Sequence, residues 1–501
     1  MFLHKPAFCK TRLCFLSSVL LSAYLPLGLT AADLGSNKIA ARLVEETSSG
    51  GPTEAFVVLA EQADLTAARS MRTRLDKGIY VYRTLRAVAE RTQASMRAML
   101  EARGIPYQSF YIVNAIKVTA DRKLLEELAA RGDVARLEAN PQVRTALPSP
   151  TGVDMPRLTS SQNLAMPTVE WNIKRVNAPS VWAMGYKGQG LVVASLDTGV
   201  KWDHPALKSH YRGWNGLSAH HNYNWLDTTR QHLTTPTDPN SHGTFTTSEM
   251  VGDDGHGNQV GVAPGAKWIA CRSMDQNGTG SPAQYIECFE FFLAPYPIGH
   301  PERANPAMAP DAINNSWDCP SSEGCSLETL VATVNAVRAA GIFPVMAAGN
   351  SGPDCSTVSV PPAFYASAVT VGATDMYTNQ ITIFSSRGPV TADRSRRMKP
   401  ELTAPGDYIR GAVPYNNEYQ GYWEGTSMAA PEVTGGVALL WQANPLLQGD
   451  VDLTVRILEQ SATPFTTTQK CGGSGLNVPN NVYGYGMLNL LPAVKQAKNL
   501  K

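Results

Sequence analysis

From near Val169 onward, short β-branched apolar runs alternate with helical stretches. The runs are LVVASLDTG, WIACRSM, AINNSW, IFPVMAAGN and SAVTVGAT. Such runs are typical of strands buried on both faces, and the alternation predicts a parallel sheet covered by helices. We therefore expect residues 169–501 to be α/β, with a doubly wound, mostly parallel sheet and helices on both faces. Active sites of such sheets lie at the carboxyl ends of strands, where Asp197, Asn315 and Asn350 stand.

A smaller α/β unit is expected to precede this sheet, over residues 55–143. Its predicted strands and helices follow the order β-α-β-β-α-β, which is the ferredoxin-like arrangement. The unit has no histidine and no plausible catalytic cluster. Residues 33–54 are polar, and we expect them to be loose. Residues 144–168 are rich in Pro, Ser and Thr, which predicts an exposed linker that contains a processing site.

The first 32 residues are predicted to be a secretory signal peptide, with a basic start, an apolar core and small residues before the cut. A membrane anchor is the alternative, but Pro26 and Gly28 interrupt the apolar run, which is short for a span. The signal predicts a secreted protein that has no membrane contact after its removal. The formal net charge is +1, so composition favours neither nucleic acid nor an anionic membrane as a partner.

Six of the eight cysteines lie beyond the predicted signal, and an even number in an exported chain predicts disulfides. Cys319 and Cys325 bracket a short loop, which favours that pair. The other four are left unassigned. No Cys/His cluster has zinc spacing.

Three polar residues are candidates for chemistry: Asp197 in LDTGV, His242 in NSHGT and Ser427 in GTSMAAP. Each also has an ordinary structural interpretation, as an aspartate in a turn, a histidine at a helix start and a helix-capping serine. The triplet DTG occurs in pepsin-like proteases, which need two such carboxylates, but this chain has no second DTG or DSG.

The order of these residues separates the classes of serine hydrolase. All nine histidines precede Ser427, whereas an α/β-hydrolase needs GxSxG and a histidine after the serine. A chymotrypsin-like enzyme would need two β-barrels, and this region is predicted to be α/β. The order Asp, His, Ser that remains is that of subtilisin. The other histidines of this region are expected at the surface: His204, His210, His220, His221, His232, His256 and His300.

With this order of residues, the chain resembles the subtilisin-like serine proteases, or subtilases, preceded by an inhibitory propeptide. The motifs LDTGV, SHGTFTT, AAGNSG and GTSMAAP carry the resemblance, with NNSW, FSSRGP and KPELTAPG in support, over roughly residues 169–493. The resemblance implies that Ser427 is the nucleophile, His242 the general base and Asp197 the residue that orients it. It implies that Asn350 contributes to the oxyanion hole.

The resemblance also implies where substrate binds. Gly278 and Gly280 match the segment that pairs with extended substrate, and Ser316 and Trp317 match the opposite strand. Two positions depart from the family pattern. Asp318 replaces a glycine, and an acid there could favour basic side chains. Glu432 replaces a histidine and is expected to add negative charge near the oxyanion.

The function implied is a secreted serine endopeptidase made as a zymogen. Its expected partners are protein or peptide substrates and its own propeptide, an intramolecular inhibitor, and a monomer is expected. The chemistry requires no cofactor. Structural calcium is compatible with the family, but no acidic run has the spacing of a calcium loop. Two alternatives remain: a catalytically silent secreted binding protein on the same scaffold, and a peptide ligase that shares the acyl-enzyme.

Overall fold

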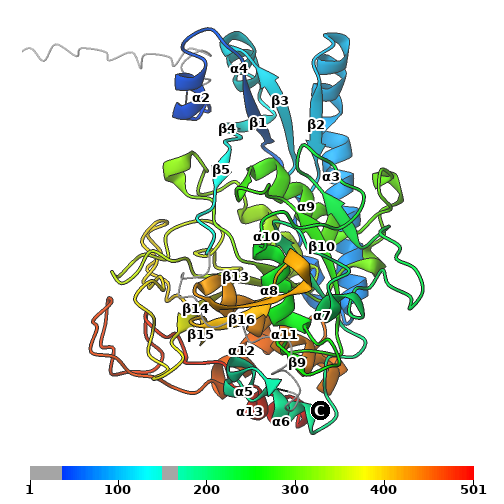
Figure 1. Ribbon diagram of the computed structural model, residues 1–501. Helices are drawn as coiled ribbons and strands as arrows, with labels where there is room; N and C mark the ends of the chain where they lie inside the picture. Colours follow the sequence, from blue (N-terminus) through cyan, green and yellow to red (C-terminus); the bar gives the residue numbers. More distant parts are fainter. Residues whose placement is uncertain (1–36, 149–167, 501) are drawn as a thin grey trace, which may run out of the picture.

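The computed structural model describes residues 37–148 and 168–500, which form two units (Figure 1). The predicted signal peptide and most of the predicted linker lie outside the described residues. Within the described ranges, no helix is both long enough and apolar enough to cross a bilayer.

The first unit contains a four-stranded antiparallel sheet in the order β2-β3-β1-β4, with β1 in contact with both β3 and β4. Its elements are α2 (Ala41–Glu46), β1 (Thr53–Leu59), α3 (Arg74–Ala102), β2 (Tyr107–Phe110), β3 (Ala115–Ala120), α4 (Arg122–Ala129) and β4 (Val134–Ala139). The predicted β-α-β-β-α-β order is therefore present. Helix α3 begins after Thr73, because the Thr73 hydroxyl accepts a hydrogen bond from the backbone N–H of Asp76.

The expectation that residues 33–54 are loose is wrong for the part that the structure describes. Helix α2 lies there, and Leu43 on it is fully buried in the core of the first unit. Ile39 forms a β-bridge with Leu137, so the segment is anchored on β4. Only two of the buried side chains, Ile39 and Leu43, are apolar, which is too few to show a helical period in the sequence.

The second unit is built on a seven-stranded sheet in the order β15-β14-β13-β12-β7-β10-β8, in which every pairing is parallel. The strands are β7 (Val192–Asp197), β8 (Trp225–Asp227), β10 (Lys267–Arg272), β12 (Ala312–Asn315), β13 (Phe343–Ala347), β14 (Val369–Thr374) and β15 (Leu402–Pro405). The predicted α/β class with a doubly wound parallel sheet is confirmed. The two edge strands, β8 and β15, were not among the predicted runs.

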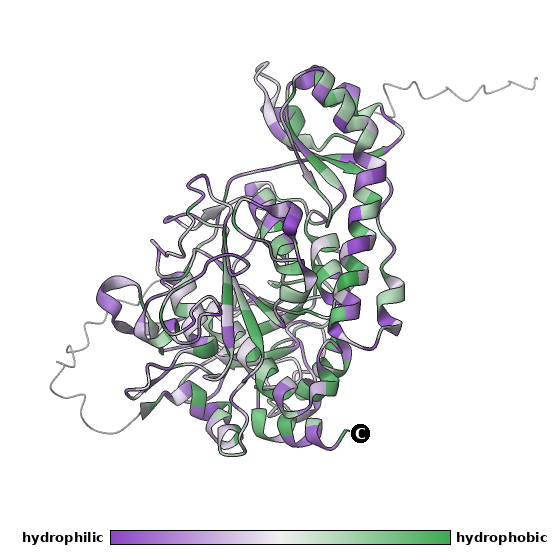
Figure 2. Cartoon of the chain, turned by 90° about the vertical axis from the view of Figure 1, so that its right-hand side faces the viewer, coloured by the Kyte–Doolittle hydropathy of each residue, from purple (hydrophilic) through white to green (hydrophobic). Residues whose placement is uncertain are grey.

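Helices cover both faces of this sheet. One face packs against α8 (His242–Val251) and α11 (Thr426–Ala443), and the other against α9 (Pro282–Leu293) and α10 (Val331–Ala339). The strands between them are coloured mostly hydrophobic in Figure 2. The remaining helices of this unit are α5 (Trp171–Arg175), α6 (Ala178–Trp182), α7 (Pro205–Lys208), α12 (Val451–Ser461) and α13 (Leu490–Lys498). Its short or peripheral strands are β6 (Thr168–Val169), β9 (Asn258–Gln259), β11 (Thr279–Gly280), β16 (Ile409–Ala412) and β17 (Tyr419–Trp423).

The first unit packs on the face that α9 and α10 cover, and one apolar cluster joins the units there. Polar contacts surround the cluster. Glu290 on α9 accepts hydrogen bonds from the backbone N–H groups of Tyr111, at 2.5 Å, and Ile112, at 2.9 Å. Glu138 on β4 accepts from the hydroxyl of Thr329 at 2.6 Å. From β4 the chain continues into β5 (Val143–Arg144), which reaches down into the second unit (Figure 1).

Three disulfides tie the second unit together. The predicted pair Cys319–Cys325 is confirmed, and the four cysteines left unassigned form Cys271–Cys288 and Cys355–Cys471. The second of these joins residues 116 positions apart, so it fixes a distant C-terminal loop to the loop that follows β13.

Candidate active site

Asp197, His242 and Ser427 come from three separate elements that meet at the carboxyl edge of the sheet. Asp197 is the last residue of β7, His242 is the first residue of α8, and Ser427 lies in the first turn of α11. The Nδ1 atom of His242 lies 2.8 Å and 2.9 Å from the two carboxylate oxygens of Asp197. Both side chains are buried, so water competes little for this hydrogen bond.

Local contacts hold Asp197 in the orientation that this bond needs. The backbone N–H of Thr198 donates to Oδ1 at 2.7 Å, and the hydroxyl of Thr246 donates to Oδ2 at 3.2 Å. The close approach of α8 to the end of β7 also explains Gly243. A Cβ atom on this residue would lie 2.1 Å from the carbonyl oxygen of Gly199, so no larger residue fits beside His242 without a backbone shift.

Asp238 is a supporting residue that the sequence reasoning missed. Its buried carboxylate accepts hydrogen bonds from the hydroxyl of Thr198 at 2.9 Å and from the backbone N–H of Ser241 at 3.0 Å. It also accepts from the backbone N–H and the hydroxyl of Thr244, at 2.8 Å and 2.7 Å. One carboxylate thus joins the turn after β7 to the start of α8. An aspartate just before a helix start is a recognisable capping signal and could have pointed to it.

Ser427 faces the end of β12. Its hydroxyl donates to the carbonyl oxygen of Ser316 at 3.4 Å, and the hydroxyl of Ser316 donates to the carbonyl oxygen of Ser427 at 2.9 Å. The Nε2 atom of His242 is buried and has no hydrogen-bond partner among the described residues. The conformation therefore contains the Asp197–His242 bond, while the serine hydroxyl is turned to Ser316. Contacts of this kind are often loose before substrate is correctly seated.

Asn350 follows β13 and lies beside the start of α11. Its Oδ1 atom accepts from the backbone N–H of Thr426 at 2.9 Å and from the Thr426 hydroxyl at 3.1 Å. Because the oxygen is used in this way, the side-chain NH2 group is the end that remains for another acceptor. Thr426 holds the residue in place and was not singled out from the sequence.

Gly278 and Gly280 border a cleft in which the end of the first unit lies. Strand β5 pairs antiparallel with β11, so that Arg144 is opposite Thr279 and Val143 is opposite Gly280. The backbone N–H of Thr145 donates to the carbonyl oxygen of Gly278 at 3.1 Å. A Cβ on Gly278 would lie 2.9 Å from a Leu147 methyl carbon, so the glycine leaves room for this chain.

Residues 143–148 continue from β11 toward Ser427. A Cβ on Gly425, two residues before Ser427, would lie 2.7 Å from Cγ of Pro148. Pro148 therefore lies beside Gly425, two positions before Ser427 in the sequence.

The opposite side of the cleft is formed by the chain that follows β12. Trp317, which was expected to contact substrate, is 3% exposed with the first unit in place, and its ring stacks on that of Tyr285, with centroids 4.0 Å apart. Its side chain packs in the apolar cluster that joins the two units. The carbonyl oxygen of Asp318 accepts from the Thr145 hydroxyl at 3.3 Å. Burial raises the pKa of the Asp318 carboxyl to about 6, and the charge of Glu323 adds to this shift.

Glu432, the departure from the family pattern in α11, does not face the cleft. It is fully buried, and the side-chain NH2 group of Asn172 donates to it and to Glu249 on α8, at 2.8 Å each. Burial raises the pKa of both carboxyls well above the usual range, and the charge of Glu432 adds to the shift of Glu249. The raised pKa values favour the neutral forms of both carboxyls. A protonated Glu432 has no negative charge, so the expectation that it adds such a charge near the oxyanion is wrong for this form.

His204 was expected at the surface, but it is buried, so this prediction is wrong. Its Nδ1 atom accepts from the backbone N–H of Ala206 at 3.1 Å, which caps α7. Its Nε2 atom lies 3.1 Å from the carbonyl oxygen of Glu418, to which it can donate. Burial lowers the pKa of His204, so this histidine is a structural residue.

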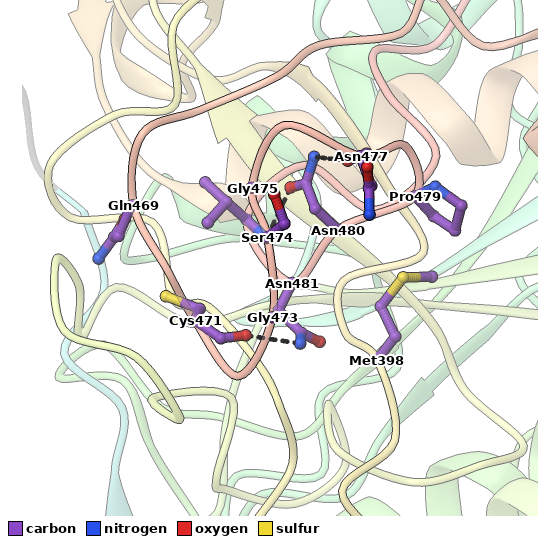
Figure 3. Close-up of a pocket in the computed structure, with 11 residues that line it drawn as sticks. Met398, Gln469, Cys471, Gly473, Ser474, Gly475, Asn477, Pro479, Asn480 and Asn481 are labelled. Carbon is purple, nitrogen blue, oxygen red and sulfur yellow. Dashed lines mark hydrogen bonds between the residues drawn. The ribbon is translucent and has the colours of Figure 1, made fainter.

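No group of three or more His, Cys, Asp or Glu side chains suited to a metal occurs in residues 37–148 and 168–500. Calcium therefore stays an expectation without a site. A pocket of about 290 Å³ is formed by the loop around Cys471, with Asn480 and Asn481 in its lining (Figure 3). None of the candidate catalytic residues lines it.

Comparison with known proteins agrees with this geometry. Residues 188–486 match the model of the subtilase family. The chain is 36% identical over 466 residues to Bacillopeptidase F of Bacillus subtilis (strain 168), an alignment that covers 90% of this chain and 31% of that protein. It is 26% identical over 359 residues to the Minor extracellular protease Epr of the same organism, covering 72% of this chain and 48% of that protein.

A third relative, Subtilisin Savinase of Lederbergia lenta, is 30% identical over 329 residues, which are 66% of this chain and 99% of that protein. The chain thus spans less than half the length of the first two relatives and nearly the whole of the third. The family model covers more than half of the chain, including Asp197, His242, Asn350 and Ser427. The chain therefore belongs to the subtilase family, and its relatives in that family are serine proteases.

Proposed function

We propose that the chain is a secreted serine endopeptidase, made as a zymogen whose first unit is an intramolecular inhibitor. The observation that carries the proposal is the buried hydrogen bond between Asp197 and His242 beside Ser427. These two residues and Ser427 come from β7, α8 and α11, which pack together at the carboxyl edge of the sheet. A silent binding protein would not need this arrangement.

In the proposed reaction His242 takes the proton of Ser427 as the hydroxyl oxygen attacks the peptide carbonyl. Asp197 holds the proton on Nδ1, which leaves Nε2 free to act as the base, and it stabilises the imidazolium that forms. The negative oxygen of the tetrahedral intermediate is met by the Asn350 side-chain NH2 group and the backbone N–H of Ser427. The imidazolium then protonates the leaving amine, and water resolves the acyl-enzyme.

Two features support the role of the oxyanion donors. Thr426 holds the oxygen end of the Asn350 amide, so its donor end is oriented before substrate arrives. Ser427 lies in the first turn of α11, where free N–H groups and the helix dipole favour a negative charge. Donors that need no rearrangement during the reaction stabilise the transition state most effectively.

The cleft contacts of residues 143–148 support an inhibitory role for the first unit. The pairing of β5 with β11 is that of an added strand, which a polypeptide substrate could form in the same way. Because the segment runs from Thr145 beside Gly278 to Pro148 beside Gly425, two residues before Ser427, we infer that processing cuts one of the bonds in this interval. Release of the new end would then open the cleft to other chains.

The test is to secrete the wild type and the Ser427→Ala variant and to determine the intact mass and N-terminal sequence of each. Loss of the first unit from the wild type alone, with a new N-terminus at residues 146–148, is the expected result. Equal trimming of both would assign the cut to another protease. A wild type that keeps the first unit and stays inactive after trace proteolysis would contradict the proposal.

A further inference from the structure

The segment that occupies the cleft forms hydrogen bonds along both of its edges. On one edge, the backbone N–H of Thr145 donates to the carbonyl oxygen of Gly278 at 3.1 Å. Successive N–H groups of an extended chain point in opposite directions, so that of Arg144 points away from β11. It donates to Oε2 of Glu323 at 2.6 Å.

The acceptor on this second edge is a side chain. The nearby backbone carbonyl of Asp318 accepts from the hydroxyl of Thr145, at 3.3 Å, and not from the N–H of Arg144. Among the described residues, the Glu323 carboxylate is therefore the acceptor for the Arg144 N–H. A carboxylate that accepts from an N–H group forms a charge-assisted hydrogen bond, which is stronger than one between neutral groups.

The loop that carries Glu323 is held by several contacts. The disulfide Cys319–Cys325 closes it, and the backbone N–H of Cys319 donates to the carbonyl oxygen of Pro361 at 2.9 Å. Gly324 adopts a left-handed conformation, with φ of 100°, directly after Glu323. Arg42 of the first unit donates to the carbonyl oxygen of Glu323 at 2.8 Å. When the first unit leaves, the disulfide remains to hold the loop.

We propose that Glu323 is a substrate-binding residue, whose carboxylate accepts the backbone N–H of the substrate residue that takes the place of Arg144. The proposal rests on the proposed function, because it concerns polypeptides that bind in the same cleft. It gives the cleft a side-chain acceptor opposite β11, so that bound chains are held on both edges. A residue without an N–H at this position, such as proline or an N-methylated residue, loses the contact.

The contact itself can be tested in the uncut full chain, without any catalysis. In the Ser427→Ala variant, residue-resolved hydrogen exchange is measured for the amides of Arg144 and Thr145. Adding Glu323→Ala should speed exchange at Arg144 about five- to tenfold and leave Thr145 within about twofold, because Gly278 still holds the latter. Glu328→Ala is the matched control, since Glu328, an exposed glutamate just after the same loop, pairs with Arg136 of the first unit, at 3.6 Å, and not with Arg144. Unchanged exchange at Arg144 would overturn the contact.

The role in substrate binding is tested with the processed enzyme and two peptides that have the sequence of residues 139–150. One peptide is unmodified, and the other has an Nα-methyl group on the residue equivalent to Arg144. For the wild type, methylation should lower kcat/KM about five- to tenfold more than it does for Glu323→Ala. Glu323→Gln, which keeps a neutral oxygen acceptor, should fall between them. Equal penalties in all three enzymes would overturn the proposal.

The outcomes also separate this proposal from the proposed function. If the unmodified peptide is cleaved but the methylation penalty does not depend on Glu323, the chain is a protease and the proposed contact of Glu323 with substrate is refuted. Absence of cleavage of any peptide would refute the protease, while the exchange rates of Arg144 would still decide whether Glu323 binds the strand.

Discussion

Replacement of Glu290 by alanine should lower the affinity of the second unit for the first. Glu290 is the last acidic residue of α9, and its Oε1 atom accepts the backbone N–H groups of Tyr111 and Ile112 at the interface of the units. Alanine leaves both donors without an acceptor where the interface excludes most water. An unsatisfied buried donor costs about 1–3 kcal/mol. Two donors, one of them only partly buried, give a loss of about 3 kcal/mol, or roughly a hundredfold in affinity.

The assay uses the separate first unit, residues 37–146, as an inhibitor of the processed enzyme, with the inhibition constant as the readout. KM for a short peptide should not change, because Glu290 lies outside the cleft. Glu287→Ala is the matched control, since Glu287 lies one turn earlier on α9 and, among the described residues, accepts a hydrogen bond from the side chain of Gln108, at 3.1 Å, and from no backbone N–H of the first unit. We expect a loss of less than tenfold for the control. A change of less than threefold for Glu290→Ala would refute the reasoning.

Three further predictions concern activity and stability. Asp238→Ala removes the carboxylate that joins the turn after β7 to α8 and should lower kcat at least about tenfold with little change in KM, measured on a peptide substrate. Burial raises the pKa of Glu432 in the folded protein, so its contribution to stability is full below about pH 4.5 and is lost as the pH rises toward the folded-state pKa. Glu432→Gln removes this titration and should make the fall of Tm between pH 5 and pH 8 less steep. An unchanged fall of Tm would contradict this. Replacing Cys355 and Cys471 by serine opens a loop of 116 residues and should cost about 4–5 kcal/mol of unfolding free energy in the chain-entropy model, measured by denaturant titration.

The fold could be predicted where strands are long, apolar and β-branched. The central strands β7, β10, β12, β13 and β14 all fall within predicted runs. The edge strands were missed for reasons of length and composition, because β8 has only three residues and β15 ends in Pro405. Short strands are assigned by their neighbours in the sheet, and a single sequence does not contain that information.

The candidate site also contains residues that the sequence identifies and residues whose role it does not settle. Asp197, His242, Asn350 and Ser427 lie in recognisable motifs, and their order along the chain separates subtilases from the other classes of serine hydrolase. The contact of Trp317 with substrate stays a prediction, because a motif identifies a segment and not the direction of each side chain.

Apolar periodicity and local motifs are properties of neighbouring residues, so the class of fold, the order of the motifs and the family could be predicted from the sequence. The groups that complete the site could not, because they come together only when the chain folds. Asp238 and Thr426 act on His242 and Asn350 through contacts that depend on how strands and helices pack. Glu323 reaches Arg144 across 179 positions of sequence. Such contacts arise when the burial of apolar surface brings distant segments together, and polar side chains then pair where the packing leaves them.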